Sequence, residues 1–122
     1  MSTVQSNKPS YIRVIAICLF RYNDRILVFN GFDHDKGTNF YRPLGGGVEI
    51  GETSAQALVR EIQEEVGVEV ADLQLLGVLE SLFTVNARAG HEIVFVYDGR
   101  FADEALYAQS MIKVTEDNGV VV

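Results

Sequence analysis

The chain has 122 residues, a length typical of one folded domain. Apolar residues make up 48% of it and charged residues 22%, which is an ordinary composition for a globular protein. The formal net charge of −7 argues against a nucleic-acid-binding protein, because such proteins usually present basic patches. No apolar stretch approaches the ~20 residues that a membrane helix needs. We therefore expect no nucleic-acid partner and no membrane partner.

The N-terminal residues and the cysteine content bear on domain organisation and location. Residues 1–10 are polar and lack the apolar segment of a signal peptide, so we expect a polar tail followed by a single domain over residues 11–122. The only cysteine, Cys18, lies in the apolar run 14–20, which predicts a buried small side chain rather than a nucleophile. A single cysteine cannot form an internal disulfide, which suits a cytoplasmic protein.

The first half of the chain predicts strands and turns. Residues 11–22 are rich in β-branched and aromatic side chains and predict a strand buried on both faces. Residues 23–24 predict a turn, residues 25–29 a returning strand and residues 30–38 a polar loop. A short extended segment over residues 39–42 leads to Pro43 and to the glycines at 45–47.

A helix is predicted over residues 53–66. Thr53 and Gln56 fit a capping box at its start, and Gly67 stands where a C-cap belongs. The side chains expected to face the core are Ala55, Leu58, Ile62 and Val66.

The second half of the chain again predicts strands. Residues 73–85 and 92–101 predict two long strands joined near residues 86–90, residues 102–109 are ambiguous, and residues 119–122 begin another strand. Strands before and after a single helix, without a regular alternation of strand and helix, indicate a mixed α+β domain.

Three carboxylates share a separate arc of the predicted helix. Glu64 and Glu65 lie three and four residues after Glu61, spacings at which like charges destabilise a helix by a few tenths of a kcal/mol per pair. Such an arc is ordinarily a solvated acidic face. It is also a ligand set that suits Mg²⁺ or Mn²⁺, which prefer carboxylate oxygens. The preceding segment distinguishes these interpretations.

Residues 46–68 follow the pattern G-x5-E-x7-R-E-U-x-E-E-x-G-U, where U is a bulky aliphatic residue. Its defined positions are filled by Gly46, Glu52, Arg60, Glu61, Ile62, Glu64, Glu65, Gly67 and Val68. The pattern matches the Nudix box at every defined position, and the chain resembles the Nudix hydrolase family, more loosely, over residues 11–101. The resemblance implies a Nudix fold, an α/β/α sandwich around a mixed β-sheet. It also implies Mg²⁺-dependent hydrolysis of a diphosphate bond in a nucleoside-diphosphate-linked substrate, with Mn²⁺ as a substitute.

The resemblance implies a role for each residue that matches the box. Glu64 and Glu65 are expected to be the main metal ligands, and Glu61 is either a further ligand or the general base. Arg60 is expected to orient the carboxylates, with Glu52 close to the cluster as a support or an additional metal residue. A backbone carbonyl of the glycine loop is a further expected ligand, here that of Gly45, although the chain has Leu44-Gly45-Gly46 where the family usually reads P-G-G.

Residues outside the carboxylate cluster complete the expected site. Substrate phosphates are expected near Gly46, Arg42 and Arg13, with further cations at Lys36 and Arg25. An additional metal ligand from outside the box is expected, with Glu104 and Glu116 as the candidates. The two histidines, His34 and His91, are too far apart in sequence to propose a zinc site.

Particular residues disfavour two alternative functions. A catalytically silent Nudix-like binding or regulatory module is disfavoured because Glu61, Glu64 and Glu65 are all present. An isoprenyl diphosphate isomerase calls for a catalytic cysteine, whereas Cys18 lies within an apolar strand.

The substrate and the C-terminus leave open questions. No proline follows Pro43, although family members specific for ADP-ribose often carry one after the box. Dinucleoside polyphosphate hydrolases often have a tyrosine in the same neighbourhood, where this chain has Phe83, Thr84 and Val85. A nucleoside triphosphate and a nucleotide sugar therefore remain as candidate substrates.

The family generally ends with a helix that closes the sandwich, whereas this sequence stops at Val122. We accordingly expect exposed apolar surface and a tendency to form a homodimer.

Overall fold

The computed structural model describes residues 11–33, 37–85, 87–108, 112–113 and 120–121. Its elements in chain order are β1 (Arg13–Tyr22), β2 (Arg25–Leu27), β3 (Phe29–Asp33), β4 (Thr38–Arg42), β5 (Leu44–Gly47), α1 (Ser54–Val66), β6 (Val70–Val85), β7 (Arg88–Phe101), the 3-10 helix η1 (Glu104–Ala108), β8 (Ile112–Lys113) and β9 (Val120–Val121). The predicted tail at residues 1–10 lies outside the described residues, as do His34, Lys36 and Glu116.

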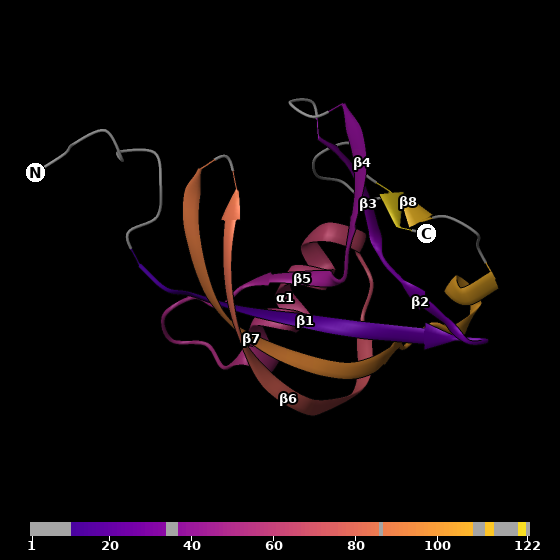
Figure 1. Ribbon diagram of the computed structural model, residues 1–122. Coiled ribbons are helices and arrows are strands. Elements are labelled where there is room, and N and C mark those ends of the chain that lie inside the picture. Colours follow the sequence, from indigo (N-terminus) through magenta and orange to yellow (C-terminus); the bar gives the residue numbers. More distant parts are fainter. Residues whose placement is uncertain (1–10, 34–36, 86, 109–111, 114–119, 122) are drawn as a thin grey trace, which may run out of the picture.

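The strands form two sheets. Sheet A has the order β2-β1-β7-β6, with β5 also paired to β1, and sheet B has the order β4-β3-β9-β8. The β1–β7 pair is parallel while β2, β5 and β6 pair antiparallel, so sheet A is mixed, as predicted. Figure 1 shows β3 and β4 standing apart from the long strands of sheet A.

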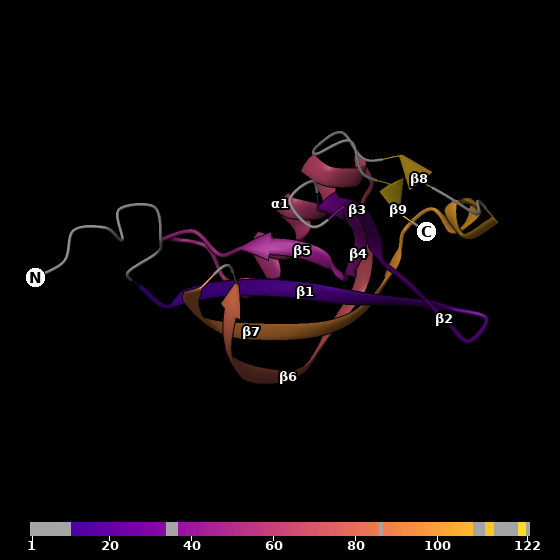
Figure 2. The same ribbon diagram turned by 45° about the horizontal axis from the view of Figure 1, so that its top comes forward.

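Helix α1 packs against β5 and β1 and covers one face of sheet A (Figure 2). The buried core beneath it comprises Ala16, Cys18, Phe20, Phe29, Leu44, Leu58, Ile62, Tyr97 and Phe101. Along β1 these buried side chains alternate with Ile15, Ile17 and Leu19, which are only partly buried. The prediction that β1 is buried on both faces was therefore wrong, because a helix covers only one face of sheet A in the described part of the chain.

Cys18 occupies the buried position that the sequence predicted. Its side chain is fully buried in the core, and burial raises the pKa of the thiol to about 12, with a smaller contribution from Asp98. A thiol with such a pKa is almost entirely protonated at neutral pH and is a poor nucleophile.

Both predicted ends of the helix are confirmed. The Thr53 hydroxyl accepts a hydrogen bond from the Gln56 backbone N–H, and the Gln56 side chain accepts one from the Thr53 backbone N–H, which is a complete capping box. Gly67 ends the helix with a left-handed φ of 75°. Leu58 and Ile62 are fully buried as predicted, whereas Ala57, which is also fully buried, was not among the expected core residues.

Several loop predictions were wrong because strand pairing extends into polar sequence. Residues 30–33 lie in β3 and Thr38 in β4, where antiparallel pairing from Phe29–Arg42 to Asp33–Thr38 satisfies their backbone groups. Residues 44–47, for which no strand was predicted, form β5 against β1. The β6–β7 pairing likewise continues to Val85 and Arg88, so the connection is shorter than the predicted residues 86–90.

The helical content agrees with an α+β domain. α1 is the one α-helix in the described ranges, and η1 occupies most of the ambiguous segment 102–109. The second helical layer of the expected α/β/α sandwich is thus not found among the described residues. No helix in this part of the chain has the length and apolar character needed to cross a membrane.

Gly45 gives a test of how tightly β5 is held against β1. Its φ is +147°, and a Cβ there would overlap the Ala16 carbonyl oxygen. We expect Gly45→Ala to unfold the protein or to lower its melting temperature sharply. The matched variant Gly67→Ala also has positive φ but open space around it, and it should cost only about 1–2 kcal/mol. Equal melting temperatures for the two variants would contradict the close packing of β5 on β1.

Candidate active site

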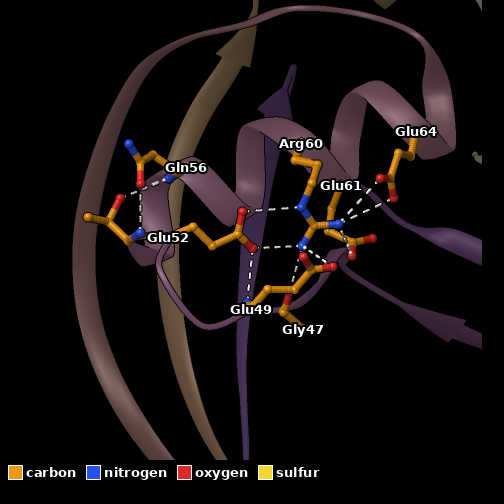
Figure 3. A network of polar contacts seen from close by, with 8 residues as sticks. Gly47, Glu49, Glu52, Gln56, Arg60, Glu61 and Glu64 are labelled. Atoms are coloured by element: carbon orange, nitrogen blue, oxygen red, sulfur yellow. Dashed lines mark hydrogen bonds and ion pairs between the residues drawn. The ribbon is translucent and has the colours of Figure 1, made fainter.

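The side chain of Arg60 is the centre of a network of carboxylates (Figure 3). Its Nη2 lies 2.7 Å from Glu52 Oε1, and its Nη1 lies 3.0 Å from Glu61 Oε1 and 3.3 Å from Glu64 Oε2. Glu49 adds a longer ion pair at 3.7 Å. The hydrogen bond from Arg60 holds the pKa of the Glu52 carboxyl below its usual range, and the same contacts raise the pKa of Arg60.

The local sequence explains how one guanidinium reaches four acids. Glu64 is one helical turn after Arg60 and Glu61 is its neighbour, while Glu52 belongs to the segment that enters the helix. That segment is itself held by a 3.0 Å hydrogen bond from the Glu49 backbone N–H to Glu52. Arg60 Nη2 also donates to the Gly47 carbonyl at 2.9 Å, which ties the helix to β5.

Glu65 lies apart from this network and is buried. Only 3% of its surface is exposed, and its Oε2 accepts a 3.3 Å hydrogen bond from Arg42 Nη2. Its other oxygen, Oε1, is buried without a hydrogen-bond partner among the described residues. Burial raises the pKa of Glu65, and the Glu61 charge adds to the increase, while Arg42 opposes it. A buried carboxylate with one unsatisfied oxygen is suited to bind a cation.

The three consecutive glycines have different roles at this site. Gly46 lies against the Glu61 carboxyl group, so that any Cβ at this position would overlap it. The Gly47 carbonyl accepts from Arg60, and Gly45, two residues earlier on β5, presents its backbone to the same side. The glycine strand therefore faces the acids of α1 directly.

A cleft of about 540 Å³ connects two of these acids with two arginines. Its lining residues are Arg13, Ile15, Ile17, Arg42, Pro43, Gly45, Gly46, Gly47, Glu61, Glu65, Glu92 and Val94. Ile15, Ile17 and Val94 provide an apolar floor from the face of sheet A that α1 does not cover. The cleft thus places carboxylates, guanidinium groups and an apolar surface side by side.

Glu92 is a cleft residue that was not among the expected catalytic, metal-binding or phosphate-binding residues. It pairs with Arg13 at 3.3 Å across the parallel β1–β7 register, in which Arg13 and Glu92 are direct partners. Glu92 is the first residue of the strand predicted over residues 92–101, and it lies within β7. Only the pairing of β1 with β7 brings these residues together, since 79 positions separate them in sequence.

Several expected site residues lie elsewhere. Glu64 is about half exposed and faces Arg60 rather than the cleft. Arg25 is exposed in β2, outside the cleft. Glu104, a candidate for the additional metal ligand, is 82% exposed and lies near Arg100, outside the cleft. His91 pairs with Glu80 on the neighbouring strand at 2.8 Å.

The side chains of the expected metal ligands are not arranged around a common position in this structure. No group of three or more His, Cys, Asp or Glu side chains in the described ranges is arranged to hold a metal ion. Glu61 and Glu64 point to Arg60, whereas Glu65 points to Arg42. The acids are therefore divided between two arginines, and a cation bound by all three would need side-chain rotations.

A family model and several known proteins match this chain. The family model described as NUDIX domain matches residues 10–110. The chain belongs to the Nudix family. A NAD-capped RNA hydrolase NudC from Pasteurella multocida is 36% identical over 80 residues, which cover 63% of this chain and 30% of that protein. The same name is carried by a Pseudomonas aeruginosa protein that is 57% identical over 37 residues, covering 30% of this chain and 13% of that protein. The chain thus spans less than a third of these relatives.

Solved structures show the same Nudix fold. The MutT NUDIX hydrolase from Burkholderia pseudomallei has a TM-score of 0.68 and 24% identity, with 93% of this chain and 82% of that chain covered. A NUDIX hydrolase from Nitrosomonas europaea has a TM-score of 0.63 and 22% identity, with 76% and 61% covered. At these identities the likeness concerns the fold, and it confirms the predicted α+β Nudix architecture.

The first glycine of the Nudix box provides a test of the site. Gly46→Ala should displace the Glu61 carboxyl and weaken Mn²⁺ binding at least tenfold, as expected when a ligand is misplaced or its support is lost. The control is Gly47→Ala, whose Cβ would meet only the Arg13 guanidinium at 3.9 Å, an ordinary contact distance. Isothermal titration calorimetry with Mn²⁺ measures both variants. Equal affinities would show that Glu61 does not depend on the space at Gly46.

Proposed function

We propose that this Nudix chain is a Mg²⁺-dependent hydrolase that cleaves a diphosphate bond in a nucleoside-diphosphate-linked substrate. The observation that carries the proposal is Glu65, a buried carboxylate with one unpartnered oxygen, in a cleft that also contains Glu61, Arg13 and Arg42. An anionic diphosphate that arrives with a divalent cation matches both signs of charge in this cleft.

The chemistry of the residues present fits a divalent cation, which would bind all three acids after Glu61 and Glu64 turn away from Arg60. Glu65 offers an unsatisfied oxygen, Glu61 lines the same cleft, and Glu64 lies one residue before Glu65 on the helix. With the Gly45 backbone they provide an all-oxygen donor set, which is what Mg²⁺ and Mn²⁺ prefer. When bound, the metal would polarise a phosphoryl oxygen and lower the pKa of an attacking water.

The chain's own side chains would supply the remaining functions. Glu61 is either a ligand or the proton acceptor for the attacking water. Arg60, which contacts Glu61 and Glu64, orients them by charge-assisted hydrogen bonds, and Glu52 holds Arg60 in turn. Arg42 and Arg13 are the cleft cations available to the phosphates, next to the backbone of Gly46.

The substrate class is proposed at the level of a nucleoside diphosphate derivative. The names of the relatives refer to NAD-capped RNA and, for a Mycobacterium tuberculosis protein 38% identical over 56 residues, to a mutator protein, so they do not agree on one substrate. The net charge of −7 favours a small molecule over a nucleic acid. A nucleoside triphosphate and a nucleotide sugar remain the two candidates.

The test is hydrolysis of a substrate panel by the protein and by Glu65→Gln. The panel contains nucleoside triphosphates, nucleotide sugars, ADP-ribose and dinucleoside polyphosphates, each with Mg²⁺ and with Mn²⁺. We expect metal-dependent cleavage of one class, reduced by at least ~100-fold in Glu65→Gln, since a carboxylate ligand becomes a neutral amide of similar size.

Glu65→Gln should remain folded, which separates catalysis from stability. A raised carboxyl pKa means that the fold favours protonated Glu65, so its contribution to stability is present in acid and is lost as the pH rises through the folded-state pKa. At neutral pH the glutamine variant should therefore melt no lower than the parent protein. Full activity in this variant would remove the proposed metal site. A folded protein inactive on the whole panel would favour the binding or regulatory module.

We also propose a cytoplasmic location and a homodimer. Reduced Cys18, buried in the core, is compatible with a cytoplasmic location.

The homodimer is supported by exposed apolar side chains along β6, namely Leu75, Leu76, Val78, Leu79, Leu82 and Phe83. Multi-angle light scattering should give twice the mass of one chain. A monodisperse monomer at high concentration would contradict the dimer.

A further inference from the structure

We propose that Arg42 is an exchangeable counter-ion, which neutralises Glu65 until a divalent cation takes that carboxylate and then transfers its guanidinium to the substrate phosphates. This inference rests on the function proposed above. Arg42 is then both the competitor of the cation at Glu65 and a ligand of the diphosphate.

Arg42 lies within reach of both the Glu65 carboxylate and the space in the cleft. It is the last residue of β4, and its guanidinium reaches Glu65 Oε2 on α1 at 3.3 Å. The Glu65 side chain is buried, whereas 41% of the Arg42 side chain is exposed. Both residues line the cleft. Arg42 therefore covers the accessible side of a buried acid and also faces the space in which a substrate would lie.

The Arg42–Glu65 contact is longer than the Arg60–Glu52 and Arg21–Asp98 contacts, and as long as the Arg13–Glu92 contact. Arg60 and Glu52 lie 2.7 Å apart, and Arg21 binds Asp98 through two hydrogen bonds of 2.8 and 3.2 Å. Arg42 donates to Glu65 once, at 3.3 Å, beyond the 2.7–2.9 Å usual for charge-assisted hydrogen bonds. The second Glu65 oxygen, Oε1, has no partner in the described part of the structure. Separation of the pair therefore breaks one long contact, and the bound cation would replace the guanidinium as the counter-ion of the buried carboxylate.

A cation bound to Glu65 would repel the guanidinium of Arg42. A divalent ion bound to this carboxylate would lie within a few ångströms of the guanidinium, and like charges at that distance repel strongly in a partly buried cleft. Cation binding and the Arg42–Glu65 contact therefore oppose each other. Removal of the arginine charge should make the cation bind more tightly.

A displaced guanidinium would remain at the cleft. The Arg42 guanidinium carbon lies 4.4 Å from the centre of the Phe29 ring, which holds the side chain by a cation–π contact independent of Glu65. A second contact, from Nη1 to the Pro43 carbonyl at 3.5 Å, lies at the cleft wall. A planar guanidinium held in this way can form two parallel hydrogen bonds with a phosphate. Loss of Glu65 as a partner would thus make Arg42 available to the diphosphate.

The test uses two probes that do not require turnover. Mn²⁺ alone is titrated by calorimetry into the whole chain, and α,β-methylene-ADP is then titrated at saturating Mn²⁺. For Arg42→Gln we expect Mn²⁺ to bind roughly fivefold to tenfold more tightly. The analogue should bind at least ~10-fold more weakly, because a charge-assisted bidentate contact is lost. Arg25→Gln, which removes the same charge outside the cleft, should alter neither affinity appreciably.

Arg42→Lys tests the exchange without loss of charge beside Glu65. Its ammonium retains the repulsion of the cation but lacks the planar fork, so Mn²⁺ affinity should stay near that of the parent protein while the analogue binds more weakly. Thermal melts show whether each variant is folded. If Arg42→Gln does not fold, the result for Arg42→Lys decides whether the exchange occurs.

The outcomes separate this inference from the proposed function. Weaker or unchanged Mn²⁺ binding in folded Arg42→Gln would overturn the exchange, because the arginine would then support the metal site rather than compete with it. Unchanged analogue binding in either variant would also overturn it. Absence of Mn²⁺ binding to the parent protein would overturn the proposed function as well.

Discussion

The arrangement of the acids depends on the guanidinium of Arg60. It contacts Glu49, Glu52, Glu61 and Glu64 and also the Gly47 carbonyl. Without that cation these carboxylates would repel one another around a short helix, at some cost to its stability. The same contacts connect α1, the segment that enters it and β5. One side chain thus joins the helix to sheet A and sets the direction of two acids.

A second arginine, from a different element, holds the remaining acid. Arg42 approaches Glu65 from the end of β4, whereas Arg60 belongs to α1. Glu64 and Glu65 are neighbours in sequence, yet one faces solvent and Arg60 while the other is buried beside β5. Adjacent residues on a helix differ by about 100° in direction, so this separation follows from the helix itself. The Nudix box therefore contains two electrostatic environments.

The strand pairing of sheet A determines which side chains line the cleft beside these acids. Parallel pairing of β1 with β7 places Arg13 beside Glu92 and places Ile15 and Val94 on the face opposite the core. The cleft consequently combines an apolar floor with charged walls, a combination common in small-molecule sites. β5, paired on the other side of β1, brings the glycines of the Nudix box to the same place.

The sequence by itself determined the features that depend on local spacing. The capping box at Thr53, the C-cap at Gly67, the buried face of the helix and the arc of Glu61, Glu64 and Glu65 all follow from residues within a few positions of one another. Burial of Cys18 followed from its apolar neighbours. The Nudix box, which lies within one continuous segment, could be found for the same reason.

Only the tertiary structure decided the features that depend on pairing between distant segments. Glu92 enters the cleft through its parallel register with Arg13, and Arg42 meets Glu65 across 23 positions of sequence. The strands at residues 30–33 and 44–47 exist because partner strands satisfy their backbone groups, which their polar or glycine-rich composition does not indicate. The physical reason is that helix caps and helix faces are set by local spacing, whereas strand pairing and counter-ion choice are set by the whole chain.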